Sequence, residues 1–319
     1  MALTYDSITA LVEKFFIPKL QDNVYIGNAL TARLTRPDKI MMIDGGERII
    51  APIVKSKTGT SGRYFSEFDA LDTSPTDDFT AAEFTWKQLQ EPIKISRLQE
   101  LKSQGSQAKL RYVAEKMKQA ERSIKENLAL GIFSDGTAST GALTTSQITG
   151  LQNVLSTSST YGGIAVADMA TWIAVVLSNS SVNRALTLNL IESAFMQAAY
   201  DQSVPTVMTM RNNIYAVLWS LFTPAQRLVS EEMDSLGFKN MLMVNGMTAL
   251  YDDHQEANTV YLLNENYLFL AVHEKENLRY DKMDKLEGQA ASLGRIYWAG
   301  NLVCNGRRYQ ARIADVATA

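Results

Sequence analysis

The side chains best suited to catalysis or metal binding in this 319-residue chain are two histidines and a single cysteine. His254 follows Asp252 and Asp253, an arrangement that could form a weak cation site. Neither histidine, however, has a second His or the Cys at the spacing of metal ligands. We therefore expect a surface turn at His254 and a strand end at His273. Cys304 lies in an apolar run, which predicts a buried and unreactive thiol.

The common catalytic and nucleotide-binding motifs are missing from the sequence. We find no G-x-x-x-x-G-K-[ST] loop, no G-x-G-x-x-G turn after a strand and no G-x-S-x-G elbow. The acidic pairs Glu231-Glu232 and Asp252-Asp253 are adjacent in sequence, so their side chains diverge, as is typical of solvated surfaces. The sequence predicts no catalytic residue, no metal and no cofactor. A soluble enzyme with a site assembled from distant residues stays open as an alternative.

Composition indicates a globular chain, since 46% of its residues are hydrophobic and 20% are charged. A net charge of −3 argues against nucleic-acid binding as the main activity, because such binding needs a basic surface. A single cysteine excludes an intrachain disulfide framework. Apolar runs are too short to span a membrane, and the N-terminus lacks the basic start of a signal peptide. We expect a soluble, intracellular protein in a reducing compartment.

Basic and acidic residues are most clearly separated along the chain in a long connection between two predicted strands, at 47–55 and 84–96. This connection has no strong period, and loops of its length inside compact domains are usually functional or mobile. One interpretation is a solvated loop in which the separation of charges is accidental. The other is a projecting loop whose basic and acidic halves contact oppositely charged surfaces of another subunit. Its basic residues come first and its acidic residues follow, in the order Lys55, Lys57, Arg63, then Glu67, Asp69, Asp72, Asp77, Asp78 and Glu83.

The clearest helix is predicted from Ser106, a possible N-cap, to about residue 130, where Gly131 marks its end. Its single narrow apolar stripe predicts a helix that lies across a surface. The stripe recurs at steps of three and four residues, namely Leu110, Val113, Met117, Ala120, Ile124 and Leu128.

After this helix, residues 134–164 carry only one charge, Asp135. We expect its glycines to supply backbone freedom and its apolar residues to anchor it. These are Gly136, Gly141 and Gly150, and Ile148, Leu151, Val154 and Leu155.

Other segments complete an α+β fold class. Helices are predicted at 4–20, 188–199 and 212–221, and short strands at 205–210, 240–244, 259–263 and 267–273. Near the C-terminus, Asn305-Gly306 separates strand-like runs at 294–304 and 307–313, which predicts a β-hairpin with a type I′ turn.

Four passages together resemble the major capsid proteins of tailed bacteriophages, the coat-protein superfamily with the Johnson fold. The long helix ends in ENLALGIFSDGTASTGALTTSQITGLQNVL, and STYGGI is followed by Trp172. The run DSLGFKNMLMVNGMTALYDDHQEANTVYLLNENYLFLAVHE comes later, and the chain closes with GRIYWAGNLVCNGRRYQARIADV. The order of elements over residues 40 to 319 carries the resemblance, since no single motif is diagnostic.

The resemblance implies an architecture for the whole chain. Residues 1–44 would form an N-terminal arm, and 45–96 an extended β-hairpin loop that reaches over a neighbouring subunit. Residues 97–164 would form a peripheral domain with the long helix as its spine, and 165–290 an axial domain. Residues 291–319 would form a C-terminal β-hairpin that completes the sheets. Under this reading the charges of the long connection become inter-subunit contacts.

The resemblance also implies a function. The chain would be a structural, non-enzymatic protein that assembles as pentamers and hexamers into an icosahedral head shell around phage double-stranded DNA, without sequence-specific DNA binding. Its further partners would be a portal, optional decoration proteins and a separate scaffolding protein, because the chain has no room for a scaffolding segment unless it is a processed form. The location would be the virion capsid, assembled in the host bacterial cytoplasm. An encapsulin-like compartment of the same fold is the alternative, distinguished by its cargo.

Overall fold

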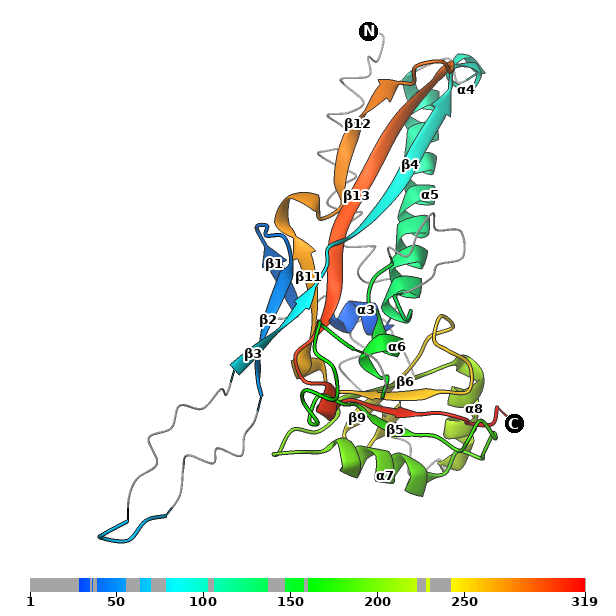
Figure 1. Cartoon of the computed structure of the whole chain (residues 1–319). Helices are drawn as coiled ribbons and strands as arrows, with labels where there is room; N and C mark the ends of the chain where they lie inside the picture. The colour runs from blue at the N-terminus through cyan, green and yellow to red at the C-terminus, as the bar shows by residue number, and fades with distance from the viewer. Residues whose placement is uncertain are drawn as a thin grey trace.

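A computed structural model describes residues 29–34, 36, 39–55, 64–69, 79–102, 106–136, 147–157, 160–222, 228–229 and 242–318 (Figure 1). The helices are α3 (Ala29–Leu34), α4 (Arg97–Lys102), α5 (Ser106–Ile132), α6 (Leu151–Val154), α7 (Leu188–Ala198) and α8 (Asn212–Leu221). The first strands are β1 (Ile40–Ile43), β2 (Ile49–Val54), β3 (Phe79–Phe84), β4 (Lys87–Ser96), β5 (Val175–Leu177), β6 (Val207–Met210) and β7 (Leu228–Val229). The later strands are β8 (Leu242–Val244), β9 (Met247–Tyr251), β10 (Val260–Leu263), β11 (Leu268–His273), β12 (Arg279–Lys285), β13 (Ala291–Cys304) and β14 (Ala311–Ile313).

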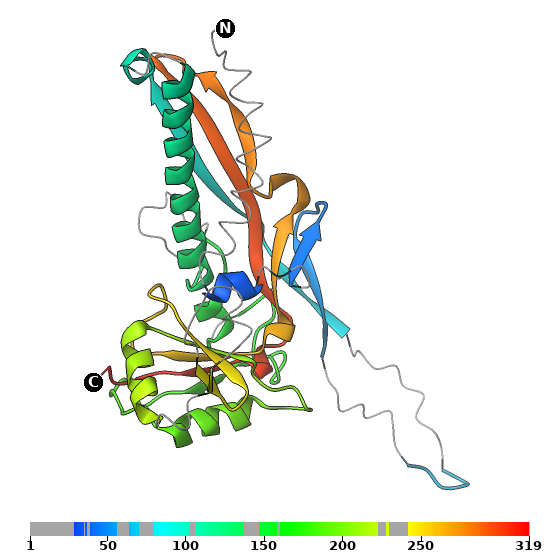
Figure 2. The same cartoon turned by 180° about the vertical axis from the view of Figure 1, so that it is seen from behind.

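One half of the molecule is a long, narrow sheet with α5 lying along it (Figures 1 and 2). Strand β13 is its axis, because β4 pairs along one side of it while β11 and β12 pair along successive parts of the other. Strand β1 adds a parallel edge next to β11. Because the resulting sheet is narrow, a single helix suffices to cover it.

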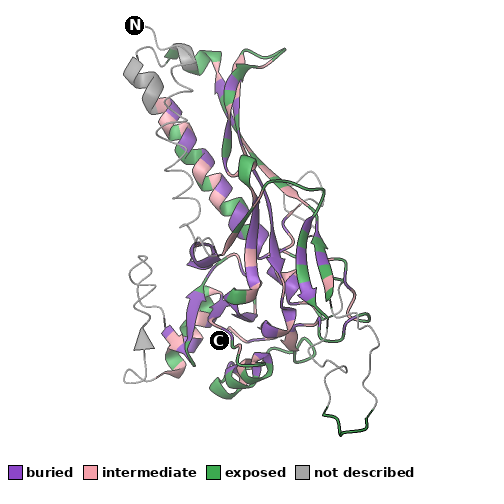
Figure 3. Ribbon diagram, turned by 90° about the vertical axis from the view of Figure 1, so that its left-hand side faces the viewer, coloured by how far each residue is buried: buried purple, intermediate pink, exposed green. Residues whose placement is uncertain are grey.

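The predicted spine helix is confirmed as α5, although it runs through Gly131 and ends at Ile132. The side chain of Leu110 lies outside the described part of the chain, and the rest of the apolar stripe faces the sheet. Val113, Met117, Ala120, Ile124 and Leu128 are all at least 95% buried. This alternation of buried and exposed positions is visible along the helix in Figure 3. The helix therefore lies on a surface with its charged faces outward, as the spacing predicted.

The other half is built on a seven-stranded sheet in the order β5-β14-β10-β6-β9-β8-β7. Successive side chains of a strand point to opposite faces. Met208, Met210 and Leu262 accordingly pack in one core with α7 and α8, whereas Val207 and Leu263 join the core of the long sheet. One face of this sheet therefore holds its own helices, and the other face packs against the half built on the long sheet. None of the helices in the described part of the chain is long and apolar enough to cross a lipid bilayer.

After α5, the described residues 147–157 are held by packing and by close backbone approach. Ile148, Leu151, Val154 and Leu155 are buried, as expected for anchoring residues. Gly136 has a φ of +82°, so it supplies the expected backbone freedom. Gly141 lies outside the described residues.

Gly150 serves a different purpose from the one expected. Its φ is −85°, which other residues also adopt. A Cβ placed there would lie 2.4 Å from the carbonyl oxygen of Gly131 and 2.5 Å from that of Ile132. Gly150 is therefore required by the space at the end of α5, and not by its own dihedral angles.

The predicted hairpin at Asn305-Gly306 is wrong. Strand β13 pairs with β4, β11 and β12, whereas β14 pairs with β5 and β10 in the other sheet. Gly306 has a negative φ of −148°, and a Cβ there would lie 2.7 Å from the ring of Tyr267. The dipeptide thus carries the chain from one sheet to the other, and its glycine makes room for an aromatic ring. The predicted helix at 4–20 lies outside the described residues.

Two buried arginines fasten segments that are far apart in sequence. Arg33 of α3 is bidentate to Glu265, with Nε at 2.6 Å from Oε1 and Nη2 at 2.8 Å from Oε2. Thr206 also donates its hydroxyl to the Glu265 carboxylate, at 3.1 Å. Arg307 donates to backbone carbonyls of Asn153, Val154, Ser156 and Trp172, so it ties the connection between β13 and β14 to the end of α6.

Candidate assembly surface

The residues with catalytic potential do not gather into a site. Within the described ranges, no group of three or more His, Cys, Asp and Glu side chains could hold a metal ion. His273 ends β11 as predicted, and its Nδ1 accepts a hydrogen bond from the backbone of Lys275. His254 lies in a turn, but its ring reaches across to Glu126 of α5, a contact that the sequence did not suggest.

Cys304 is fully buried at the end of β13, as the apolar run predicted. Burial raises the pKa of its thiol to about 12, which leaves almost no thiolate at neutral pH. We expect native protein to be inert to a thiol-specific chromogenic reagent at about pH 8 and to release one equivalent of chromophore after denaturation. Fast reaction of the native protein would contradict the buried position.

Strands β2 and β3 form a separate two-stranded ribbon at the side of the molecule. Its inner face packs on the loop around Gly162. There, Glu83 donates its backbone N–H to the Gly162 carbonyl at 2.9 Å, and Phe84 meets the ring of Tyr161 edge-on at 5.0 Å between centroids. A Cβ on Gly162 would lie 2.6 Å from that of Ala82, so the loop and ribbon are in tight contact.

The outer face of this ribbon is largely apolar and uncovered in the single chain, with the charged Glu83 opposite Ile50 at one end. Ile50 and Val54 of β2 are 62% and 51% exposed, and Phe79 of β3 is 75% exposed. Val54 stands directly opposite Phe79 in the pairing register, so their side chains share one face. Apolar side chains clustered on the outside of a strand pair are typical of a surface that binds another protein.

Residues 64–69 belong to the same long connection between β2 and β3, and they lie well clear of the body of the molecule (Figure 1). Tyr64, Phe65 and Phe68 are exposed there. Asp69 accepts a hydrogen bond from the backbone of Ser66, which fixes a small turn. Aromatic side chains presented on a turn so far from the core add little to the stability of the single chain.

The charged residues of the long connection are only partly placed. Lys55 is exposed at the end of β2, and Glu67 and Asp69 are exposed at the distal turn. Lys57, Arg63, Asp72, Asp77 and Asp78 lie outside the described residues. Glu83, the last of the acidic residues, forms an ion pair with Arg48 across the base of the ribbon and is therefore paired within its own chain.

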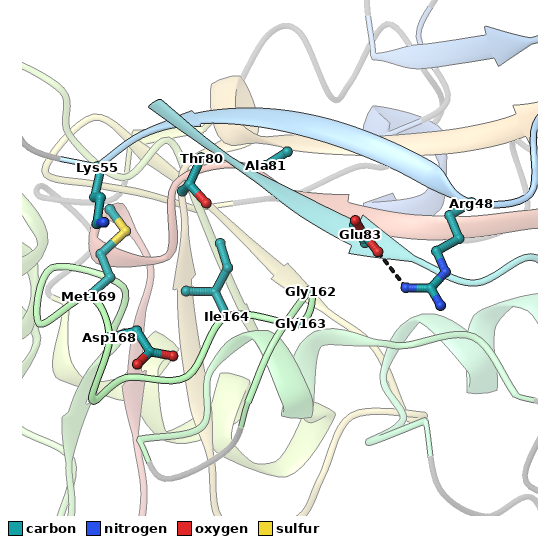
Figure 4. A pocket seen from close by; sticks show the side chains of 10 residues that line it. All are labelled: Arg48, Lys55, Thr80, Ala81, Glu83, Gly162, Gly163, Ile164, Asp168 and Met169. Carbon is teal, nitrogen blue, oxygen red and sulfur yellow. Dashed lines mark hydrogen bonds and ion pairs between the residues drawn. The ribbon is translucent and has the colours of Figure 1, made fainter. Parts of the chain in front are cut away.

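A cavity of about 420 Å³ opens beside the base of the ribbon (Figure 4). Its charged lining residues are Arg48, Lys55, Glu83 and Asp168, and the Arg48–Glu83 ion pair lies at one end. The lining includes no histidine or cysteine, and Thr80 is its one hydroxyl side chain. This lining provides neither a nucleophile with a base nor a metal site, so the cavity does not support an enzymatic reaction.

The signals for the uncovered face were present in the sequence. The strand IIAPIV is apolar on both faces, which is unusual for a ribbon of two strands, because one face of such a ribbon ordinarily meets water. The charge pattern predicts contacts through charged side chains alone, whereas the structure adds the exposed apolar side chains of Ile50, Val54 and Phe79.

Comparison with known families decides what this elongated molecule is. The model of the SU10 major capsid protein family matches residues 86–317, which is most of the chain. The chain belongs to this family. The SU10-family capsid protein is thus a structural protein of the virion capsid and not an enzyme, and the α+β class and Johnson fold expected from its sequence are confirmed.

Solved structures agree on the fold of this capsid protein. The cyanophage A-1(L) capsid protein shares 15% identity at a TM-score of 0.66, covering 88% of this chain and 90% of that chain. A capsid protein of the native GTA particle shares 13% identity at a TM-score of 0.62, covering 90% of each chain. No curated relative matches the capsid protein by sequence.

An encapsulin also shares the fold. The holo-SrpI encapsulin of Synechococcus elongatus is 11% identical at a TM-score of 0.54, covering 90% of each chain. Fold likeness alone therefore does not separate a phage shell from a cellular compartment. The family match makes that distinction, and it supports the self-assembling phage shell.

Proposed function

We propose that this capsid protein builds the icosahedral head shell of a tailed phage as pentamers and hexamers, with double-stranded DNA enclosed. The observation that supports this most is the uncovered apolar face of the β2–β3 ribbon, in a chain whose family forms capsids. A net charge of −3 suits a wall that surrounds DNA without binding it tightly. Assembly takes place in the host cytoplasm with a separate scaffolding protein and a portal, and decoration proteins are optional.

We further propose the domain roles that this shell requires. Residues 1–44 act as the N-terminal arm and 45–96 as the extended loop, which projects as the ribbon and is anchored through β4. Residues 97–164 make up the peripheral domain, and 165–290 supply the axial domain except for β11 and β12, which lie in the long sheet beside α5. Residues 291–319 contribute strands to both sheets. Pairing of β4 with β13 over ten residue pairs supports a rigid anchor for the loop.

The extended loop binds the next copy of the chain through apolar contacts, with its charges setting orientation. Fully burying a side chain such as Ile or Phe contributes about 1.5–3 kcal/mol, and three such residues lie on the ribbon's outer face. Exposed ion pairs contribute about 0–1 kcal/mol each. We propose that Lys55, Lys57 and Arg63, and the acidic Glu67, Asp69, Asp72, Asp77 and Asp78, meet complementary charges on neighbours and select the correct register.

Replacing Ile50, Val54 and Phe79 together by threonine is therefore expected to prevent shell formation while the chain still folds. Threonine keeps the strand propensity of these positions and removes apolar surface that only a neighbour would cover. Sedimentation velocity and negative-stain electron microscopy of the full chain with its scaffold measure assembly, and circular dichroism measures folding. Particles in normal yield would contradict the proposed docking face.

Two matched variants separate a loss of docking from a loss of folding and from a loss of charge. Ile53→Thr changes the buried inner face of the same strand, where exposure is 5%, and is expected to lower the melting temperature. Reversal of Lys55, Lys57 and Arg63 to Glu leaves the apolar face intact and is expected to reduce the yield of regular particles without changing the fold. Regular particles in full yield from this triple variant would show that the charge sorting is incidental.

A further inference from the structure

His254 joins two parts of the molecule that are distant in sequence. It lies in the turn between β9 and β10, at the end of the seven-stranded sheet. Its Nε2 is 2.9 Å from a carboxylate oxygen of Glu126, which lies 128 residues earlier on α5. Its Nδ1 is 2.6 Å from Asp252 Oδ1. A single imidazole ring thus spans the gap between α5 and the seven-stranded half.

The chemistry of this arrangement requires an extra proton. A neutral imidazole has one N–H donor, whereas the imidazolium has two. An ionised carboxylate is only an acceptor. With a carboxylate against each ring nitrogen, both contacts are hydrogen bonds only when the ring is protonated.

The two carboxylates differ in burial, and this difference decides which hydrogen bond is lost when the ring loses a proton. Asp252 is 7% exposed and also accepts the backbone N–H of His254 at 3.0 Å. Glu126 has a side chain that is 63% exposed. In a neutral ring the remaining N–H stays with the buried Asp252, and the lone pair of Nε2 then faces the Glu126 carboxylate.

Other charged groups nearby do not replace the two carboxylates. On the sheet side, Glu256 is paired with Arg312 at 2.7 Å, and Arg211 donates to the backbone carbonyl of Asp253. On α5, Arg122 and Lys125 precede Glu126 in sequence. Between α5 and β4, Ser123 donates to Glu91 at 2.8 Å, and burial raises the pKa of the Glu91 carboxyl.

We propose that His254 is a proton-operated fastening between α5 and the seven-stranded half of the capsid protein, closed when the ring is protonated and open when it is neutral. The contact lies within one chain, so it is present in a single subunit and is independent of the shell.

The direction of the pH effect follows from the ring's environment. Burial lowers the pKa of His254, but hydrogen bonds and charge from Glu126 and Asp252 outweigh it, so the pKa lies above its ordinary value. A raised pKa in the folded state stabilises that state below about pH 6.5, and the stabilisation is lost as the pH rises through the raised value. The fastening therefore closes in mild acid and opens in mild alkali.

The full-length protein can test this by NMR, because its two histidines give only two sets of ring signals. His273→Gln identifies the signals of His254. We expect the pKa of His254 to lie above 6.5 in the parent and to fall in Glu126→Gln. A His254 pKa that is unchanged by Glu126→Gln would overturn the proposal.

A second measurement reports the fastening itself. Amide hydrogen exchange around residues 252–258 is expected to be slower at about pH 6 than at about pH 8, after correction for intrinsic rates, and this difference is expected to disappear in Glu126→Gln. Glu126 is exposed, so this variant folds even if His254→Asn does not. An equal pH difference in the parent and in Glu126→Gln would also overturn the proposal.

Discussion

Replacing Arg33 by methionine is expected to lower the free energy of unfolding by about 3–5 kcal/mol, because it leaves the Glu265 carboxylate buried without its counterion. The side chains of this pair are 7% and 9% exposed, so water cannot take the place of the guanidinium. Thr206 donates one hydrogen bond to the carboxylate, which does not neutralise its charge. Chemical denaturation of the full chain, followed by circular dichroism, measures the loss.

A double replacement tests whether the loss comes from the unpaired charge. Arg33→Met with Glu265→Met removes both charges and is expected to recover much of the stability, since buried ion pairs can be exchanged for apolar residues at little cost. Arg48→Gln breaks an ion pair whose side chains are about half exposed, and it is expected to cost less than about 1 kcal/mol. An Arg33→Met loss no greater than that of Arg48→Gln would contradict a buried, desolvated pair.

Arg307→Met is expected to cost at least about 3 kcal/mol, because several backbone carbonyls lose their donor at once and each buried orphan costs about 1–3 kcal/mol. Its guanidinium is 2.9 Å from the Val154 carbonyl through Nε and 3.1 Å from the Trp172 carbonyl through Nη1. It also lies over the ring of Tyr161, 5.2 Å from the centroid. Loss of these contacts releases the end of α6 from the connection between β13 and β14. Thermal unfolding with limited proteolysis of residues 150–172 measures the effect.

Arg307→Lys separates charge from geometry. A lysine keeps the charge but offers a compact ammonium in place of a planar fork, so it cannot serve carbonyls from two segments together. We expect it to recover only part of the stability lost in Arg307→Met. Arg312→Met, at a partly exposed ion pair with Glu256, is the matched control and is expected to cost less. Full stability of Arg307→Lys would show that charge alone is sufficient.

Local patterns predicted the elements well, because they depend on residues close in sequence. The stripe from Val113 to Leu128 predicted α5, and apolar strand-like runs located β2 and β11. The hairpin at Asn305-Gly306 failed because turn propensity is a local preference. Strand β14 instead pairs within the second sheet, where β10 and β5 lie on either side of it.

Contacts between distant residues escaped sequence reasoning. Arg33 and Glu265 are separated by 232 positions, and nothing near either residue marks it as buried. His254 looked like a residue of a surface turn, since Glu126 is remote in sequence. The order of elements nevertheless carried the family resemblance, because fold topology is retained after individual motifs have diverged.

Cryo-electron microscopy of the particles formed by the full chain tests the central proposal most directly. We expect closed icosahedral shells in which the outer face of every β2–β3 ribbon is covered by the next copy, so that Ile50, Val54 and Phe79 become buried. Shells in which these ribbons extend into solvent would contradict the proposed docking face. A chain that stays monomeric with its scaffold at high concentration would contradict the proposed shell itself.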